Sequence, residues 1–443
     1  MLSTLRNAWK VQDLRKKIIW TVFLIAIFRM GSYIPVPGID TDSLKALTQS
    51  GSLVSFYDLI SGGSFSRFSI FALGVVPYIN ASIIMQLLTV AIPKLEQLSK
   101  EGDDGRKKIQ KITRYASIVI GAITAYGSYV IINNVGALKS NSPVSMFSTI
   151  ANLGATSGVG TLEKIVIIFS LVVGSTFLMW LGDQITVKGV GNGTSLIIFA
   201  NILSSLPMTG YQIYNLSKIG KINVVEVALF IFFTLALLAG VIYLSLAERR
   251  ITVQYAGKAV GNKMMKGQST HIPLSIIGTT VIAIIFAMSV MSFPTTIAQF
   301  FPEAGWSQWI TGSSYSPFNA KTWMYPVLYA LLTIFFTWFY TQITFKPDEM
   351  AENMHKSSGF IPGIRPGKPT EIYLEKVLNR ISMFGGCFAA IIAVVPILVA
   401  NYTPFQGIQF GGTSLLILVS VSLEIMRQLE SQLTMRHYQG FLK

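Results

Sequence analysis

The sequence predicts an all-α integral membrane protein with ten transmembrane helices, and three observations indicate this fold class. Hydrophobic residues make up 51% of the 443 residues, charged residues make up only 12%, and the mean hydropathy is +0.54. Long stretches contain no Asp, Glu, Lys or Arg, and most approach the roughly 20 residues that a helix needs to cross a bilayer. The Lys and Arg residues concentrate in every second segment between these stretches. This patterning excludes an ordinary soluble globular domain of this length.

Ten apolar segments are expected to be the transmembrane helices. The first covers residues 16–35 and carries Arg29 near its outer end, where a long side chain must reach the interface or find a partner. The last charge-free stretch, 381–423, is too long for one crossing, and turn-forming residues at 401–412 divide it into two helices. The seven segments between them are 68–93, 115–138, 165–182, 189–217, 227–247, 272–302 and 322–345.

The distribution of positive charge predicts the orientation of these helices. Most of the 35 Lys and Arg residues fall in the N-terminal segment, in 94–114, at 188, in 249–266, in 346–380 and in 427–443. Because loops rich in Lys and Arg stay on the cytoplasmic side, both termini are expected in the cytoplasm. The net charge of +15 is then cytoplasmic surface charge and not a DNA-binding footprint, although such a surface attracts acidic lipid headgroups and ribosomal RNA.

The ten segments divide into two groups of five. Residues 1–211 form an N-terminal half, residues 223–443 form a C-terminal half, and the polar residues 212–222 link them. Because each half crosses an odd number of times, a structural repeat would place the second half upside down relative to the first. Residues 53–67 of the N-terminal half are amphipathic and too short to cross. They are either an external loop or a re-entrant segment that lines a protein cavity.

Two long segments, residues 248–271 and 346–376, are expected on the cytoplasmic side. Prolines around position 365 fix backbone angles and stiffen the second segment. Each segment is either a docking site for a partner or a solvated loop that satisfies the positive-inside pattern. The basic residues singled out in them are Arg249, Arg250, Lys263 and Arg365.

The sequence lacks the signatures of enzymatic or ion-coupled chemistry. The glycine-rich run at 189–195 has neither the preceding strand nor the following Lys of a phosphate-binding loop. The three histidines lack metal-ligand spacing, so no metal or other cofactor is assigned. Acidic residues within the spans are few, which disfavours an ion-coupled transporter. The single cysteine, Cys387, is expected to be a packed core residue.

A series of motifs that covers nearly the whole chain is the most specific feature of the sequence. It begins with FRMGSYIPVPGI at 28–39, SGGSFSRFSIFALG at 61–74, PYINASIIMQLLT at 77–89 and EGDDGRKKI at 101–109. It continues with MWLGDQITVKGVGNGTS at 179–195, QSTHIP at 268–273, GFIPGIRPG at 359–367 and FGGTSLLI at 410–417. In this order and at these spacings, the motifs resemble those of the SecY/Sec61-alpha family of protein-conducting channels.

The resemblance implies two five-helix halves around an hourglass pore, which opens sideways between helices two and three on one side and seven and eight on the other. It also implies that residues 53–67 are a plug helix in the outer funnel. Gln86 matches a polar position of the lateral gate, and it is either a gate residue or an amide that is hydrogen-bonded within the helix bundle. The plug residues singled out are Phe56, Asp58, Gly62, Gly63 and Phe65. A pore ring of six side chains at the waist, matched by the family motifs, is Val75, Ile79, Thr194, Ile198, Ile285 and Ile417. Val75 and Thr194 depart from the all-isoleucine ring of some relatives.

The function that the resemblance implies is that of a channel subunit in the bacterial cytoplasmic membrane, not of an enzyme. Such a channel moves unfolded secretory polypeptides outward and releases transmembrane segments into lipid. The implied partners are SecE, SecG, the ATPase SecA, the translating ribosome, the precursor polypeptide and membrane lipids, and the four basic residues named above are expected to contact SecA and the ribosome. Two other classes stay open, namely a secondary transporter with a polar site at mid-membrane and a non-conducting scaffold.

Overall fold

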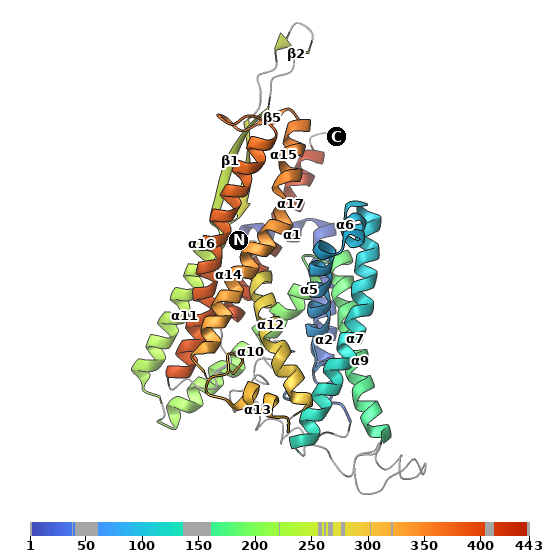
Figure 1. Ribbon diagram of the computed structural model, residues 1–443, viewed down its shortest axis with the longest axis vertical. Helices are drawn as coiled ribbons and strands as arrows, with labels where there is room; N and C mark the ends of the chain where they lie inside the picture. Colours follow the sequence, from blue (N-terminus) through green and yellow to red (C-terminus); the bar gives the residue numbers. More distant parts are fainter. Residues whose placement is uncertain are drawn as a thin grey trace.

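The computed structural model of the chain is predominantly helical (Figure 1). It describes residues 2–37, 39, 61–135, 161–220, 222–255, 259–260, 263–264, 269–275, 280–301, 303–319, 322–403 and 412–440. The helices of the N-terminal half are α1 (Leu2–Lys10), α2 (Gln12–Gly31), α5 (Val76–Ala91), α6 (Pro93–Lys100), α7 (Asp103–Val135), α9 (Thr161–Lys188) and α10 (Gly193–Lys218). Those of the C-terminal half are α11 (Val224–Ser245), α12 (Thr280–Phe300), α13 (Gly305–Gly312), α14 (Met324–Phe345), α15 (Pro347–Lys356), α16 (Lys368–Tyr402) and α17 (Gly412–Gly440). The strands are β1 (Glu248–Tyr255), β2 (Ala259–Val260), β3 (Lys263–Met264), β4 (Ser269–Ser275) and β5 (Gly359–Phe360).

Each of the ten segments expected to cross the membrane contains a helix, and these helices are α2, α5, α7, α9, α10, α11, α12, α14, α16 and α17. Within the described residues, five helices are long and apolar enough to span a membrane by length and composition, and α5 with α6 adds a sixth if that bent pair is one span. The predicted helical membrane fold is therefore confirmed. The number of ten crossings stays a prediction.

The apolar stretch 68–93 does not form one straight helix. Residues 62–75 form turns, and α5 begins only at Val76. Ile92 has an extended backbone, with φ −108° and ψ 113°, because the ring of Pro93 disfavours a helical residue before it. The chain is consequently bent by 100° between α5 and α6. The short helix α6 then lies beside the start of α7 (Figure 1).

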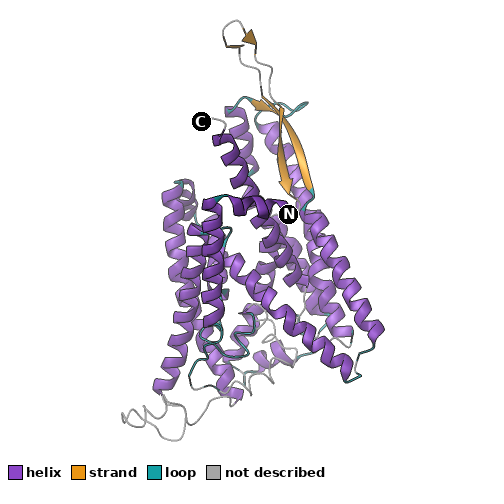
Figure 2. Cartoon of the chain, turned by 180° about the vertical axis from the view of Figure 1, so that it is seen from behind, coloured by secondary structure: helices purple, strands orange, loops and turns teal. Residues whose placement is uncertain are grey.

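A small sheet joins the two long segments expected in the cytoplasm, and the sequence did not predict it. β1 pairs antiparallel with β4 and, through its last residues, with β5, so that the strand order is β4-β1-β5. Ile251 and Val253 on β1 are buried with Leu374 of α16 in one apolar cluster. Figure 2 shows these strands at one end of an otherwise helical molecule. The sheet therefore makes one unit of two segments that lie about a hundred residues apart in the sequence.

Two apolar clusters form the core of the apolar helices. The N-half cluster contains Leu24, Phe28, Phe71, Val75, Leu178, Leu181, Ile185, Leu196, Ile197, Ile198, Ile202, Ile417 and Val421. The C-half cluster contains Ile83, Val241, Ala283, Ile284, Phe286, Ala287, Met291, Tyr325, Tyr329, Phe336, Ala389, Ile392, Ala393, Leu416, Val419 and Leu423. Helix α17 contributes to both, since Ile417 and Val421 belong to the first cluster and Leu416 and Val419 to the second.

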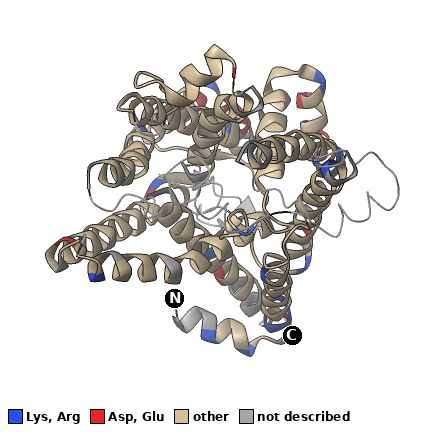
Figure 3. Cartoon of the chain, turned by 90° about the horizontal axis from the view of Figure 1, so that it is seen from below, with Lys and Arg blue, Asp and Glu red and all other residues tan. Residues whose placement is uncertain are grey.

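The segments expected on the cytoplasmic side lie at one end of the molecule. Figure 1 shows α6, α15, β1 and β5 at that end and α13 at the opposite end. In the view from the α13 end, Figure 3 shows Lys, Arg, Asp and Glu as a few coloured bands on ribbons that are mostly tan. This arrangement is the one that the positive-inside pattern requires. Which side of the membrane this end faces stays a prediction.

Two local expectations differ from the structure. Helix α10 continues to Lys218, so most of the linker 212–222 is helical, and the helix ends just before Gly220, which adopts a φ of +75°. The prediction of Cys387 as a packed core residue is wrong, because its side chain is exposed on α16. An apolar position on a membrane helix is buried in protein only on the face toward the bundle, and Cys387 lies on an outward face.

Candidate functional site

The aliphatic residues of the predicted pore ring come together between the two halves. Val75, Ile198 and Ile417 are buried members of the N-half cluster, at 2%, 4% and 6% exposure. Ile79 and Ile285 are partly buried and pack against both the N-half and the C-half cluster. The structure thus brings five of the six predicted residues into one apolar region, with contributions from α5 and its N-cap, α10, α12 and α17.

Local helix geometry explains how the N-terminal half presents its ring residues. Val75 is the N-cap residue of α5, and its carbonyl accepts a hydrogen bond from the backbone N–H of Ile79 at 3.0 Å. The two side chains are therefore one helical turn apart and lie on the same side of α5. Helix α10 begins just before Thr194, because the Asn192 side chain accepts hydrogen bonds from the backbone N–H groups of residues 194 and 195.

Thr194 has a different environment from the other five residues. It occupies the first turn of α10, where Gly193 lies close to the Gly182 carbonyl of α9. A Cβ placed on Gly182 would lie 3.4 Å from the Thr194 Oγ1. The Thr194 hydroxyl therefore lies against α9, and the predicted ring residues that the apolar region contains are the five aliphatic ones.

The predicted plug segment is described only in its last part. Phe56 and Asp58 lie outside the described residues. Gly62 and Gly63 adopt φ values of +64° and +80°, which residues with a side chain rarely adopt. Phe65 is 4% exposed and packs in an apolar cluster with Phe68, Ile132, Ile167 and Leu171. The described end of the segment is therefore packed into the N-terminal half.

The predicted gate residue Gln86 lies on α5, where its Nε2 donates a long hydrogen bond of 3.4 Å to Ser82 Oγ. Among the described residues, its buried Oε1 has no hydrogen-bond partner. Helix α12 of the C-terminal half packs against both α5 and α7 of the N-terminal half. This contact corresponds to the predicted meeting of helices two and three with helix seven.

The predicted docking residues lie on the small sheet and its surroundings but not in one cluster. Arg249 and Arg250 are exposed near the start of β1, opposite Leu274 and Pro273 of β4. Lys263 begins β3 in a separate two-stranded sheet with β2. Arg365 is exposed in the turn after β5, which pairs with the other end of β1. The two ends of β1 are separated by roughly 20 Å at about 3.3 Å per residue, so the arginines form two separate basic positions.

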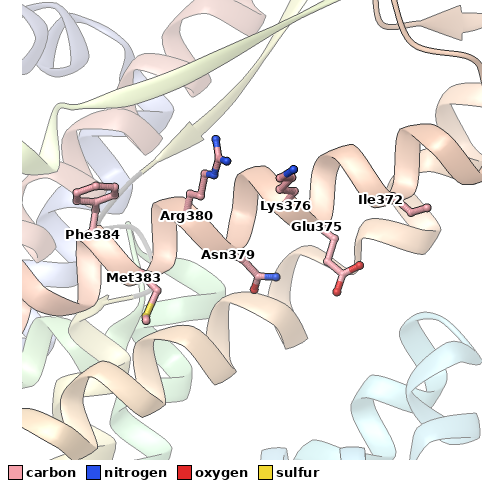
Figure 4. Close-up of a pocket in the computed structure, with 7 residues that line it drawn as sticks. All are labelled: Ile372, Glu375, Lys376, Asn379, Arg380, Met383 and Phe384. Carbon is pink, nitrogen blue, oxygen red and sulfur yellow. The ribbon is translucent and has the colours of Figure 1, made fainter.

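A groove along α16 was not foreseen from the sequence. It has a volume of about 450 Å³ and is lined by Ile372, Glu375, Lys376, Asn379, Arg380, Met383 and Phe384. Figure 4 shows Lys376 and Arg380 on one side of the helix and Glu375, Asn379 and Met383 on the other. The Asn379 Oδ1 accepts hydrogen bonds from Trp338 Nε1 at 2.8 Å and Gln342 Nε2 at 2.5 Å, which joins α16 to α14. The sequence offered no signal for this groove, because its residues come from a single helix with no motif.

Charged contacts connect the helices at the end that carries α6. Arg114 of α7 lies 2.8 Å from Asp183 of α9, and Gln110 donates to the same carboxylate at 3.3 Å. On the surface, Lys100 Nζ donates to Glu96 Oε1 at 2.7 Å, and this hydrogen bond and the positive charge hold the pKa of the Glu96 carboxyl below its ordinary value. Within the described residues, no group of three or more His, Cys, Asp or Glu side chains is arranged to hold a metal ion.

Comparisons with known proteins match the whole chain. A family model described as SecY matches residues 69–426. The chain is 41% identical over 458 residues to the protein translocase subunit SecY of Halalkalibacterium halodurans, and 41% identical over 452 residues to that of Bacillus subtilis. Both alignments cover 100% of this chain and 100% of the relative.

Solved structures with the same fold share less of the sequence. One described as "The structure of a protein conducting channel" has a TM-score of 0.64 at 18% identity, and the match covers 94% of this chain and 92% of that chain. Another, described as "Sec61 in the Canine ribosome-channel complex from the endoplasmic reticulum", has a TM-score of 0.61 at 18% identity over the same shares. At this identity the two structures demonstrate a common fold.

Proposed function

Because this chain belongs to the SecY family, we propose that it forms the pore of a channel that moves unfolded polypeptides across the membrane and releases transmembrane segments sideways into lipid. It is a protein translocation channel subunit and not an enzyme. The observation that carries the pore assignment is the meeting of five aliphatic side chains where the two apolar clusters adjoin.

The physical demands of translocation account for such a region. An unfolded chain in hydrocarbon would expose backbone N–H and C=O groups at a cost of several kcal/mol each, so it needs an aqueous path. The path must still hold back water and ions when it is empty. A constriction of Val75, Ile79, Ile198, Ile285 and Ile417 meets both demands. It excludes water and ions because it dewets when empty, and it lets a polypeptide pass because it offers no fixed hydrogen bonds or charges that would retain the chain.

The contact between the two halves supports a lateral gate on the α5 and α12 side. Helix α12 reaches both α5 and α7, and the buried Oε1 of Gln86 on α5 has no hydrogen-bond partner in the described part of the chain. A buried acceptor without a partner destabilises the contact that buries it, by about 1–3 kcal/mol. An interface that must part during membrane insertion benefits from such a weak point, since an apolar segment then partitions into lipid.

The partners proposed are other channel subunits, here SecE and SecG, together with SecA and the ribosome. The small sheet offers two basic positions, Arg249 with Arg250 and Arg365, and both are exposed. Basic side chains at such positions attract ribosomal RNA and acidic protein surfaces. The end that carries the sheet is proposed to face the cytoplasm of a bacterium, with the chain in the cytoplasmic membrane.

Reconstitution tests the proposed function. Vesicles that hold this chain, SecE and SecA are expected to import an unfolded precursor when ATP is supplied. The Arg365→Glu variant is expected to abolish import, whereas Lys368→Glu, a reversal at an exposed residue three positions later, is expected to retain most of it. Import at the wild-type rate by Arg365→Glu would favour a scaffold, and saturable flux of a small solute without polypeptide import would favour a transporter.

Cross-linking tests the ring. In a Cys387→Ser background, which removes the exposed native thiol, cysteines at Ile79, Ile198 and Ile417 are expected to cross-link to a stalled precursor. A cysteine at Leu203, which is 49% exposed on the same helix as Ile198, is the matched control and is expected to remain unlinked. Equal cross-linking at Leu203 and Ile198 would contradict the ring.

A further inference from the structure

A polar contact on α2 and α10 holds the described end of the predicted plug segment. The Arg29 Nη1 of α2 donates a hydrogen bond of 3.3 Å to the Asn201 Oδ1 of α10. Asn201 is 1% exposed and Arg29 is partly buried, so the contact is partly shielded from solvent. The residue that packs onto both side chains is Gly62. A Cβ there would lie 2.6 Å from the Asn201 Oδ1 and 2.9 Å from the Arg29 Nη1.

Gly62 is held in this position for two independent reasons. Its φ of +64° belongs to the left-handed region, which a side chain disfavours. A Cβ would also lie only 3.0 Å from the Cα of Asn201, so backbone as well as side-chain atoms enclose the site. Gly102 has a similar φ of +80°, but nothing lies within 4 Å of a Cβ built on it. A comparison of substitutions at Gly62 and Gly102 therefore distinguishes the effect of backbone strain from that of steric contact.

The residues around Gly62 form a fixed turn and not a loose loop. The backbone N–H of Phe65 donates to the Ser61 Oγ at 3.1 Å, and Ser61 is 3% exposed. Further along, the backbone N–H of Ile70 donates to the Ile34 carbonyl at 3.0 Å, and that of Val36 donates to the Phe68 carbonyl at 2.9 Å. The turn is thereby attached to the chain that follows α2, the helix that carries Arg29.

Asn201 lies close to the proposed ring along helix α10. It follows Ile198 by three residues on α10, so the two side chains lie on neighbouring parts of one helix face. At about 1.5 Å per residue, Asn201 lies roughly 4.5 Å further along the helix axis than Ile198. The same helix therefore carries a ring residue and, less than one turn away, the residue that holds Gly62.

We propose that Arg29 and Asn201 form a polar clasp on Gly62, which fixes the described end of segment 53–67 relative to the ring. The clasp thereby keeps the resting channel impermeable to ions. Both are positioning residues that act through the Gly62 turn. The proposal rests on the proposed function, because it presumes a channel that must be closed at rest. A hydrogen bond from a guanidinium is stronger than one between neutral groups, and the partial burial of this one strengthens it further.

The test measures ion leak and polypeptide import in the same vesicles, which hold the full chain with SecE. The variants Asn201→Ala, Arg29→Gln and Gly62→Ala are expected to raise the resting ion conductance about tenfold, equivalent to a shift of about 1.4 kcal/mol toward the leaky state. ATP-driven import is expected to stay near the wild-type value in all three variants. The unfolding temperature is expected to stay near the wild-type value in Asn201→Ala and Arg29→Gln, whereas Gly62→Ala, which adds backbone strain and a steric contact, is expected to lower it. The double variant Arg29→Gln with Asn201→Ala is expected to leak no more than the leakier single variant, because each substitution removes the hydrogen bond that the two side chains share.

Two matched controls accompany these variants. Gly102→Ala introduces the same backbone strain without a steric contact. Ser205→Ala, one turn beyond Asn201, removes a hydroxyl that bonds only to the Ile202 carbonyl of its own helix among the contacts described. Both controls are expected to show the wild-type leak.

The outcomes distinguish the clasp from the proposed function. Failure of the wild-type chain to import a precursor would contradict the channel assignment, and with it the clasp. Normal import with an unchanged leak in the clasp variants would overturn the clasp alone. A leak that rises equally in Gly102→Ala or Ser205→Ala, or only in parallel with a lower unfolding temperature, would also overturn it. If Arg29→Gln does not insert, Asn201→Ala and Gly62→Ala decide the question.

Discussion

Glycine residues determine how closely several parts of the N-terminal half approach one another. A Cβ on Gly174 of α9 would lie 2.0 Å from the Ile70 carbonyl oxygen, and one on Gly193 would lie 1.9 Å from the Gly182 carbonyl oxygen. Both contacts are to backbone atoms, which cannot rotate away as a side chain does. Membrane helices commonly use small residues in this manner, because burial of apolar surface does not drive their association in lipid.

The substitution Gly174→Ala is expected to destabilise the protein by about 1–3 kcal/mol, because the added methyl group forces α9 away from residue 70. The matched control is Gly121→Ala on α7, where the nearest atom to a new Cβ is the Ser175 Oγ at 3.3 Å. Thermal unfolding in detergent measures the difference. Equal unfolding temperatures for the two variants would show that the close contact of Gly174 with the Ile70 carbonyl does not contribute to stability.

The ion pair of Glu96 and Lys100 predicts a pH dependence. The hydrogen bond from Lys100, and then its charge, lower the pKa of the Glu96 carboxyl, and the same partner raises the pKa of Lys100. A carboxyl with a lowered folded-state pKa stabilises the fold above the unfolded-state pKa near 4.5, and this contribution is lost as the pH falls through the folded-state value. Because both side chains are exposed, the effect on stability is expected to be too small to measure.

Carboxyl NMR of Glu96 measures the effect directly. The titration midpoint is expected below 4.5, and Lys100→Met is expected to raise it. A midpoint that does not change in Lys100→Met would contradict the assignment of the shift to this pair.

Among single residues, a charged position within a membrane helix was easier to interpret from the sequence than an aliphatic one. Arg29 was expected to need a partner, and the structure supplies Asn201. The ring residues are different, because aliphatic side chains occur throughout membrane helices and no local pattern marks those at a pore. Only the resemblance to a family selected Ile198 or Ile285. The exposed Cys387 was mispredicted for a related reason, since hydropathy does not distinguish lipid from protein as a surrounding.

Among elements, the sheet of β4, β1 and β5 depends on an apolar cluster beneath it. Leu374 of α16 is 0% exposed in this cluster, whereas Ile372, two residues earlier, is 59% exposed. The variant Leu374→Ala is expected to destabilise this unit by about 2–5 kcal/mol, because it leaves a cavity. Hydrogen exchange of the β1 amides is expected to accelerate in Leu374→Ala and to stay unchanged in Ile372→Ala. Equal exchange in the two variants would show that the cluster does not support the sheet.

Helices were predictable and strands were not, for a physical reason. A charge-free stretch of about 20 residues has few alternatives to a helix in lipid, since every backbone group must be paired within the segment. Segment 248–271 is long, polar and basic, and β5, the second pairing partner of its strand β1, is about a hundred residues away. No local signal encodes such a pairing. The bend at Pro93 was equally hidden in hydropathy, although the proline itself marks it.

For the whole molecule, the orientation in the membrane follows from the positive charges and is open to a direct test. In a Cys387→Ser background, a cysteine at Tyr315 is expected to react with a membrane-impermeant maleimide added to intact cells, and a cysteine at His271 is expected not to react. Inverted vesicles are expected to give the opposite result. Both positions are exposed on the protein surface, so labelling of both from one side would contradict the predicted topology.

The general arrangement of the molecule was predictable because it depends on the number of apolar segments and on the distribution of Lys and Arg, and both can be read from the sequence. The grouping of basic segments at one end agrees with the structure (Figure 1). The relative positions of the two apolar clusters were not predictable without the family, because they depend on which face each helix turns toward its neighbours.

The double membership of α17 constrains how the molecule can move. Neighbouring residues of this helix pack in opposite directions, Leu416 into the C-half cluster and Ile417 into the N-half cluster. It also packs against α10 and α11, the helices that flank the connection between the halves. If the halves separated as two blocks, one side of α17 would lose its apolar surroundings. A separation confined to the contact of α12 with α5 and α7 would spare that loss, because α17 would then keep apolar neighbours on both of its sides.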